Sequence, residues 1–361
     1  MRMKPVLAFL LGCCLVGTSL AADDTMDPKL REQTRRAVDR GLHYLREQQA
    51  ENGSLSKSVG ITALALKAFL TAHRGYNETD GAFITRPVNF LVANAQPDGA
   101  ISESLQNRAY NTATALSALA ATKNDKYAPI LEKGRNFLKG HQIDESEGYD
   151  KSHRYYGGIG YGGDERPDMS NQFIALEAMR AASLDPKDPI WQKALTFISR
   201  SQNRSESNDQ SWAGNDGGFV YMPGGNIAPF KGTDSYGGMT AAGLMTLLFA
   251  GADKNDPRVI AAHGWIKKNY AVDVNPGTGG RKDGIYYYYY AVAMAMSAMG
   301  EAEFVDGQGR KHNWRNELAT QLLSLQATDG SWVNKDSAMW WQDNPHLVTA
   351  WSVNALVNVL K

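Results

Sequence analysis

The feature that most constrains the fold of this chain is a sequence unit that recurs six times. Each copy is an amphipathic helical segment that ends in an aromatic and apolar pair, and in five copies a Gln follows. The clearest copy continues as Gln-Ala-Thr-Asp-Gly-Ser-Trp at residues 326–332. The other copies fall at residues 41–53, 88–99, 134–142, 194–219 and 263–266. Such self-similarity predicts a repeat architecture in which every unit packs against its neighbours.

A second kind of helical segment follows each unit and is small and apolar on nearly every face. These segments are expected at residues 59–72, 110–122, 169–182, 236–251, 286–300 and 346–360. A helix that is apolar all round must be buried all round, whereas the preceding segments keep charged faces, such as the one with Arg31, Glu32 and Arg35. The sequence therefore predicts an all-α (α/α)6 toroid, with an inner ring of buried helices inside an outer ring of amphipathic ones. No period-two alternation indicates a substantial sheet.

The element formed by Gln, Gly and an aromatic residue has a structural interpretation. Gly supplies a backbone conformation that other residues avoid at a turn. The Gln amide can bond exposed backbone groups at helix ends, and the aromatic ring can pack between adjacent repeats. We expect no catalysis from this element.

The motif at residues 326–332 resembles the Gln-Trp motif of squalene and oxidosqualene cyclases. Its repetition together with buried helices that contain Thr-Ala also resembles the β subunits of protein prenyltransferases. The resemblance spans nearly the whole chain after the first segment, and it implies the toroid fold. It leaves the activity open, because the same double ring is used for cyclisation, prenyl transfer, thioester proteins and, in a related arrangement, polysaccharide degradation.

The catalytic residues of the resembled families are mostly missing. Class II cyclases carry Asp-x-Asp-Asp before a Thr-Ala pair, and that run occurs nowhere in this chain. Protein prenyltransferases bind zinc with an Asp, a Cys two residues later and a His on the last buried helix. Asp283 matches the first of these ligands, but Ile285 stands at the Cys position and Val348 near the His position. One ligand of three does not support a zinc site, so we predict no metal and no other cofactor.

The first 22 residues have the order of a secretory signal peptide. Arg2 and Lys4 precede a nearly continuous apolar run at residues 5–17, and small residues follow at cleavage spacing. We therefore expect residues 1–22 to be removed and residues 23–361 to act as a single toroid domain in the periplasm or outside the cell. A retained anchor is the alternative, although the apolar run is short for a bilayer span.

The two cysteines of the chain, Cys13 and Cys14, both lie in this first segment. The mature chain would therefore have no disulfide, thiolate zinc ligand or cysteine nucleophile. Lipidation at Cys13 is a less favoured interpretation, because the apolar stretch before it is short. Lys and Arg together number 38, as do Asp and Glu, so we expect no nucleic-acid partner. No later apolar run is long enough to predict a transmembrane segment in the mature chain.

Loops that lead into the buried helices would face a central cavity, and residues 155–171, 281–290 and 339–346 are rich in aromatic and charged side chains. Residues 232–238 form a plainer fourth case. The candidate acids and bases of a catalytic site are Asp168, Asp283, Asp343 and His346. Candidate ligand-binding residues of the cavity are Tyr161, Asp164, Arg166, Asn171, Tyr236, Tyr286, Tyr290, Trp340 and Trp341.

These candidates have structural alternatives. Asp168 and the Asp-Asn pair at residues 343–344 can serve as helix N-caps. The five tyrosines at residues 286–290 spread over all faces of a helix, so most of them must be packing residues. Arg166 can pair with Asp164 or Asp168 instead of a ligand.

Two main hypotheses about function follow. The first is an exported protein that binds an extended isoprenoid-like or glycan ligand in an aromatic cavity and transforms it by metal-independent acid–base chemistry. It requires Asp168, Asp283 and His346 to converge, and a glycan lyase would use Tyr161, Arg166 and His346. The second is a binding or scaffold toroid without catalysis, for a lipid, a glycan or a protein partner. A prenyltransferase with a rebuilt site is a third interpretation.

Overall fold

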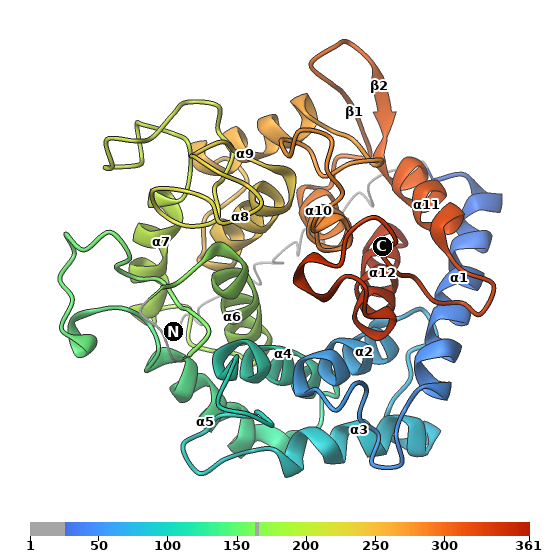
Figure 1. The fold of residues 1–361 in the computed structure, drawn as a ribbon. Coiled ribbons are helices and arrows are strands. Elements are labelled where there is room, and N and C mark those ends of the chain that lie inside the picture. Colours follow the sequence, from blue (N-terminus) through green and yellow to red (C-terminus); the bar gives the residue numbers. More distant parts are fainter. Residues whose placement is uncertain (1–25, 163–165) are drawn as a thin grey trace, which may run out of the picture.

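The computed structural model describes residues 26–162 and 166–361. The predicted signal peptide, with Cys13, therefore lies outside the described residues. Within them the chain forms twelve α-helices and one short hairpin (Figure 1). The elements are α1 (Pro28–Glu47), α2 (Val59–Thr71), α3 (Ala82–Ala93), α4 (Arg108–Ala121), α5 (Ala128–Lys139), α6 (Met169–Ala181), α7 (Ile190–Arg200), α8 (Gly237–Phe249), α9 (Pro257–Lys268), α10 (Ile285–Met299), β1 (Glu303–Val305), β2 (Lys311–Asn313), α11 (Trp314–Leu325) and α12 (Pro345–Val359).

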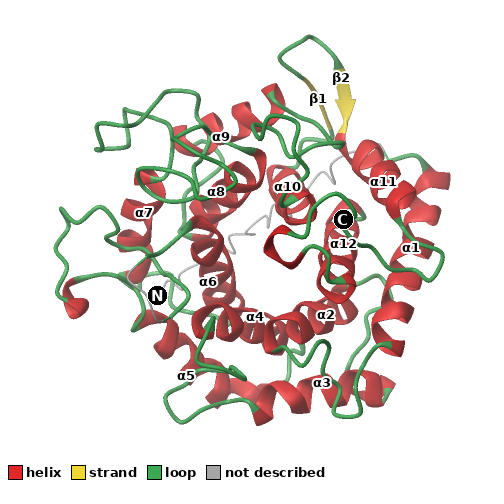
Figure 2. Ribbon diagram, in the orientation of Figure 1, coloured by secondary structure: helices red, strands yellow, loops and turns green. Residues whose placement is uncertain are grey.

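The even-numbered helices form a closed inner ring. Each packs against the next, and α12 returns to pack against α2. The odd-numbered helices surround them as an outer ring, with α1 contacting both α11 and α12 (Figure 2). The predicted bounds of the six inner helices agree with the observed ones to within two residues. The (α/α)6 toroid is confirmed, because helices apolar on all faces are stable only when other helices cover every face.

The Gln of the repeat ties neighbouring repeats together through its amide. Gln142 donates to the Gly157 carbonyl at 3.0 Å, within its own turn, and to the Ile190 carbonyl at 3.1 Å, on α7. Gln326 forms the same pair of bonds, with the Gly330 carbonyl and with the Ala37 carbonyl on α1, both at 2.9 Å. The last repeat is thus joined to the first by the bond that joins repeats elsewhere, and this closes the ring.

In five of the six repeats, the turn Gly packs directly on the backbone of the next outer helix. These five glycines have φ between +84° and +96°, a conformation that side chains disfavour. A methyl group built on any of them would lie 2.7 Å or less from a backbone atom of that helix. They are Gly53, Gly99, Gly157, Gly217 and Gly330. Glycine is therefore required for conformation and for space at once.

The Thr of the Thr-Ala pairs holds the turn against the inner helix. The backbone N–H of Trp332 donates to Thr349 Oγ1 at 3.0 Å, and that of Phe219 donates to Thr240 Oγ1, also at 3.0 Å. In the third repeat Gln172 takes this place and accepts from the Ile159 N–H at 2.8 Å. The Thr-Ala pair is therefore a structural feature of this chain.

Candidate functional site

A cavity of about 420 Å³ lies inside the inner ring, at the end where the inner helices begin. All six inner helices contribute to its wall, mainly with residues from their first two turns. Loops complete the wall, and the loop before α12 reaches over the centre of the ring (Figure 1). This chamber is therefore built by every repeat.

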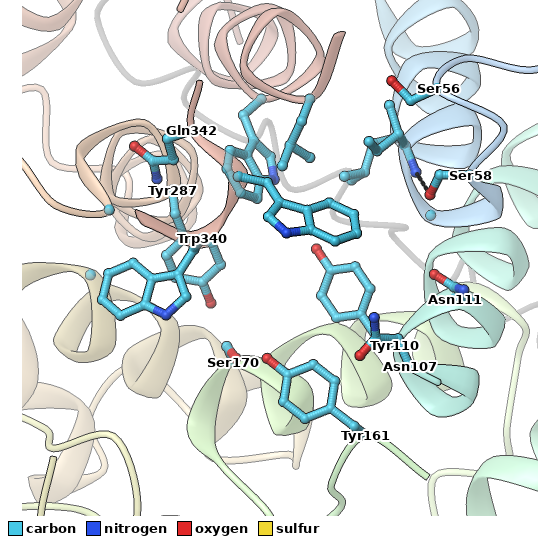
Figure 3. A pocket seen from close by; sticks show the side chains of 18 of the residues that line it. Ser56, Ser58, Asn107, Tyr110, Asn111, Tyr161, Ser170, Tyr287, Trp340 and Gln342 are labelled. Carbon is cyan, nitrogen blue, oxygen red and sulfur yellow. Dashed lines mark hydrogen bonds between the residues drawn. The ribbon is translucent and has the colours of Figure 1, made fainter. Parts of the chain in front are cut away.

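The wall of this cavity is largely aromatic and aliphatic. Tyr110, Tyr161 and Tyr287 approach the open space from different sides (Figure 3). The rings of Tyr110 and Tyr161 stack with their centroids 6.5 Å apart. Trp340 lines the cavity and packs on Phe230, with their ring centroids 5.6 Å apart. Phe230 in turn packs on Tyr236, with a centroid distance of 4.7 Å. Rings in this arrangement suit an apolar ligand better than a highly hydrated one.

Strained backbone is concentrated around this cavity. Seven described residues other than glycine have positive φ, and five of them line the cavity. Those five are Ser56, Lys57, Asn107, Trp340 and Trp341. Side chains adopt the left-handed region at a cost of about 1–2 kcal/mol each. Such strain is common at functional sites, so it supports this cavity as the candidate site.

Asp168 is the N-cap of α6 and lies behind the cavity wall. Its Oδ1 accepts from the backbone N–H groups of Ser170 and Asn171 at 2.8 and 2.9 Å, and its Oδ2 accepts from Asn171 Nδ2 at 2.7 Å. Burial raises the pKa of Asp168, although hydrogen bonds from Ser170, Asn171 and Tyr221 lower it in part. Ser170 and Tyr221 line the cavity and separate Asp168 from it.

Asp283 lies near the start of α10 and is held by partners outside the cavity. Its Oδ2 accepts from Arg281 Nε and its Oδ1 from Ser337 Oγ, both at 2.6 Å. Burial alone would raise the pKa of Asp283, but the hydrogen bonds from Ser337 and Arg281 outweigh it, so the pKa is lowered. Asp283 therefore serves as an ionised anchor between two loops, and it does not reach the cavity.

His346 and Asp343 lie at the beginning of α12, outside the cavity wall. The Nδ1 atom of His346 lies 2.8 Å from Ser56 Oγ, and burial lowers the pKa of the ring. Asp343 is exposed, and the N-cap of α12 is Asn344. Asp168, Asp283 and His346 thus do not converge in one cavity.

The predicted ligand-binding residues divide into two groups. Tyr161, Tyr236, Trp340 and Trp341 line the cavity, whereas Asn171, Tyr286 and Tyr290 are engaged elsewhere and Arg166 is exposed. Asn171 bonds Asp168, and the Tyr286 hydroxyl donates to the Val333 carbonyl at 3.3 Å. Asp164 lies outside the described residues.

Tyr110, Tyr221 and Trp351 also line the cavity, although the sequence did not indicate them as ligand-binding residues. Tyr110 and Trp351 stand on helices that are apolar on almost every face. Nothing in such a sequence separates a ring that faces a cavity from one that packs between helices. Tyr221 lies in the long insertion before α8, which carries no motif.

A largely buried polar cluster lies inside the inner ring, one helical turn beyond the cavity. Lys67 on α2 pairs with Glu177 on α6 and donates to the hydroxyl of Tyr290 on α10 at 3.2 Å. Lys67 and Tyr290 lie one helical turn beyond the cavity-lining residues Leu64 and Tyr287. We call Lys67, Glu177 and Tyr290 the floor cluster. It joins three alternate inner helices across the ring.

No protein-family model and no curated protein matches this chain. Solved structures do match it. A variant of the type II terpene cyclase MstE from Scytonema, in complex with its substrate geranylgeranyl dihydroxybenzoate, gives a TM-score of 0.58 at 12% identity, over 92% of this chain and 99% of that chain. Candida albicans protein geranylgeranyltransferase-I, complexed with GGPP, gives a TM-score of 0.51 at 13% identity, over 91% of this chain and 90% of that chain. The chain has the terpene cyclase and prenyltransferase toroid fold.

A protein from Actinoplanes has the same toroid fold, with a TM-score of 0.55 at 16% identity over 91% of this chain and 100% of that chain. In the present toroid, seven of the eight positions directly before the Thr-Ala pairs line the cavity, and Val348 is the exception. The seven are Gly60, Ile61, Tyr110, Asn111, Gly238, Met239 and Leu347. None of these side chains is acidic. Among the described residues, no three His, Cys, Asp or Glu side chains come together as a metal site would require.

Proposed function

We propose that this toroid binds an extended isoprenoid-type ligand, with the hydrocarbon chain of the ligand in the central cavity. The observation that carries the proposal is a chamber of about 420 Å³ with a mainly aromatic and aliphatic wall drawn from all six inner helices. Its volume falls within the range of about 300–1,000 Å³ that is common for small-molecule sites. The geranylgeranyl compounds bound to the two named structural neighbours support the same ligand class.

The charges around the cavity favour an isoprenoid over a glycan. Lys57 and Glu103 are the charged side chains among the described residues of the wall. Glu103 already accepts from the Val59 N–H and from Asn111 Nδ2, both at 3.1 Å. Arg166, which would neutralise a uronate, is exposed and outside the wall. A sugar needs a hydrogen-bond partner for every buried hydroxyl, whereas a hydrocarbon chain packs directly against the aromatic and aliphatic side chains of the wall.

The test measures binding of geranylgeraniol through the quenching of tryptophan fluorescence. Trp340, Trp341 and Trp351 line the cavity and therefore report on a bound ligand. Gly238→Leu is expected to weaken binding at least tenfold, or about 1.4 kcal/mol. Gly238 lines the cavity on α8, and a methyl group built on it has no neighbour closer than 3.6 Å. The larger side chain therefore fills space that the ligand needs without a backbone clash.

Gly264→Leu is the matched control, since Gly264 lies on the outer helix α9 and a methyl group there meets nothing within 4 Å. This variant should bind geranylgeraniol as the native protein does, and both variants should keep the native melting temperature. Equal binding by Gly238→Leu and Gly264→Leu would refute the cavity as the site. Absence of binding to the native protein would refute the isoprenoid ligand.

Proton transfer to the bound ligand is the second candidate function, and the raised pKa of Asp168 favours it. Asp168 contacts Ser170 and Tyr221, which both line the cavity, so these hydroxyls could relay a proton. Mass spectrometry of geranylgeraniol after incubation tests this function. Conversion by the native protein but not by Asp168→Asn would establish it, whereas unchanged ligand from both would leave binding as the activity.

We further propose that the protein acts outside the cytoplasm, as the order of charged, apolar and small residues in segment 1–22 indicates. Among the described residues, none of the helices combines the length and apolar character needed to cross a bilayer. Fractionation of the source cells, with N-terminal sequencing of the recovered protein, tests this proposal. A cytoplasmic protein that keeps residues 1–22 would contradict it.

A further inference from the structure

Three hydrogen-bond donors at the cavity have no partner among the residues that the structure describes. They are the indole Nε1 of Trp351, the amide Nε2 of Gln342 and the hydroxyl of Tyr287. All three residues line the cavity. Trp351 is 4% exposed and Gln342 is fully buried. A buried donor without a partner costs about 1–3 kcal/mol, so three of them at one cavity indicate that something else satisfies them.

The three donors lie where α10 meets α12. The rings of Tyr287 and Trp351 contact each other edge to face, with their centroids 5.9 Å apart. Gln342 contacts the residue next to Tyr287, because its Oε1 accepts from the Tyr286 N–H at 3.3 Å and from Asn334 Nδ2 at 3.1 Å. Figure 3 shows Gln342 and Tyr287 on the same side of the cavity. The two bonds to Oε1 fix the orientation of the amide, so its NH₂ group is the end left free.

The chemistry of these donors defines their missing partner. An indole N–H and an amide NH₂ can only donate, so the partner must be an acceptor. A charged acceptor does not fit, because Lys57 is the one cation among the described residues of the wall, and Glu103 adds a negative charge. A diphosphate would need several cations or a metal ion to balance its charge.

We propose that the ligand carries an uncharged oxygen acceptor, such as a hydroxyl or carbonyl group, which binds where α10 meets α12, at the side of the cavity that carries these donors. This inference rests on the proposed binding of an isoprenoid-type ligand and specifies its polar end. The hydrocarbon chain fills the remaining apolar space of the cavity. The ligand is thus a neutral isoprenoid alcohol or ketone, and a prenyl diphosphate is excluded as the preferred form.

The test compares three probes on the full chain by tryptophan fluorescence. These are geranylgeraniol, geranylgeranyl diphosphate, and the hydrocarbon in which hydrogen replaces the hydroxyl of geranylgeraniol. The native protein is expected to bind the alcohol about tenfold more tightly than the hydrocarbon or the diphosphate. Tyr287→Phe should reduce this preference severalfold, because it weakens binding of the alcohol only. Combining Tyr287→Phe with Trp351→Phe should reduce the preference further.

Tyr288→Phe is the matched control, because the Tyr288 hydroxyl donates to the Ala271 carbonyl at 2.9 Å and lies away from the cavity. This variant should keep the native preference for the alcohol. Equal affinity for the alcohol and the hydrocarbon would overturn the inference while the proposed function stands. Tightest binding of the diphosphate would also overturn it. Binding of none of the probes would overturn the proposed function and the inference together.

Discussion

Replacing Glu177 with alanine is expected to lower the free energy of unfolding by about 3–5 kcal/mol. The side chains of Glu177 and Lys67 are only 12% and 16% exposed, and they pair at 2.5 Å. Removal of the carboxylate leaves the Lys67 ammonium buried without its counter-charge. The remaining contact of Lys67 with Tyr290 supplies a neutral oxygen at 3.2 Å and no charge. Urea denaturation followed by circular dichroism measures the change.

The double variant Lys67→Met/Glu177→Leu is the control for this prediction. It removes both charges at once and keeps apolar volume across the ring, so it should be within about 1 kcal/mol of the native protein or more stable. A Glu177→Ala variant as stable as the native protein would contradict a buried floor cluster. Equal losses in the single and double variants would show that packing, and not the unpaired charge, is responsible.

Gly157→Ala is the second substitution with a large expected effect. Gly157 has φ of +85°, and its new methyl group would lie 1.8 Å from the Lys193 carbonyl oxygen on α7. The left-handed conformation costs about 1–2 kcal/mol and overpacking about 1–3 kcal/mol, so the expected loss is about 2–5 kcal/mol. The same denaturation experiment measures it. Separation of α6 and α7 would accompany the loss, because the turn can no longer pack on the outer helix.

Gly148→Ala separates the two contributions. Gly148 has nearly the same φ, +81°, but a methyl group there meets nothing within 4 Å. Only the conformational cost applies, so the expected loss is about 1–2 kcal/mol. If the two variants lose the same stability, the close approach of the turn to α7 does not occur in solution.

Gly157 also takes part in a contact that the sequence alone does not reveal. In the sixth repeat, Gln326 and Gly330 are close in sequence and their relation is visible. In the third repeat, residues 143–156 separate Gln142 from Gly157, yet the Gln142 amide bonds the Gly157 carbonyl in the same way. An insertion leaves the tertiary contact in place while it removes the spacing by which the contact could be recognised.

The candidate site was predicted in part. Aromatic loops were expected at the cavity, and Tyr161, Tyr236, Trp340 and Trp341 line it. The carboxylates of the same loops are engaged in caps and ion pairs instead. Asp168 caps α6, and Asp283 pairs with Arg281. A loop places both kinds of residue within a few positions of each other, and only side-chain direction decides which of them faces the cavity.

By itself the sequence determined the double ring of helices. Periodicity and the contrast between apolar and amphipathic segments carry this information, because burial of apolar surface dominates helix packing. The tertiary structure alone decided which side chains from six separate helices share one cavity. It also decided that Lys67, Glu177 and Tyr290 meet across the ring and that Tyr287, Trp351 and Gln342 keep free donors. Ring closure brings these residues together. Local sequence patterns do not predict contacts between residues that lie so far apart along the chain.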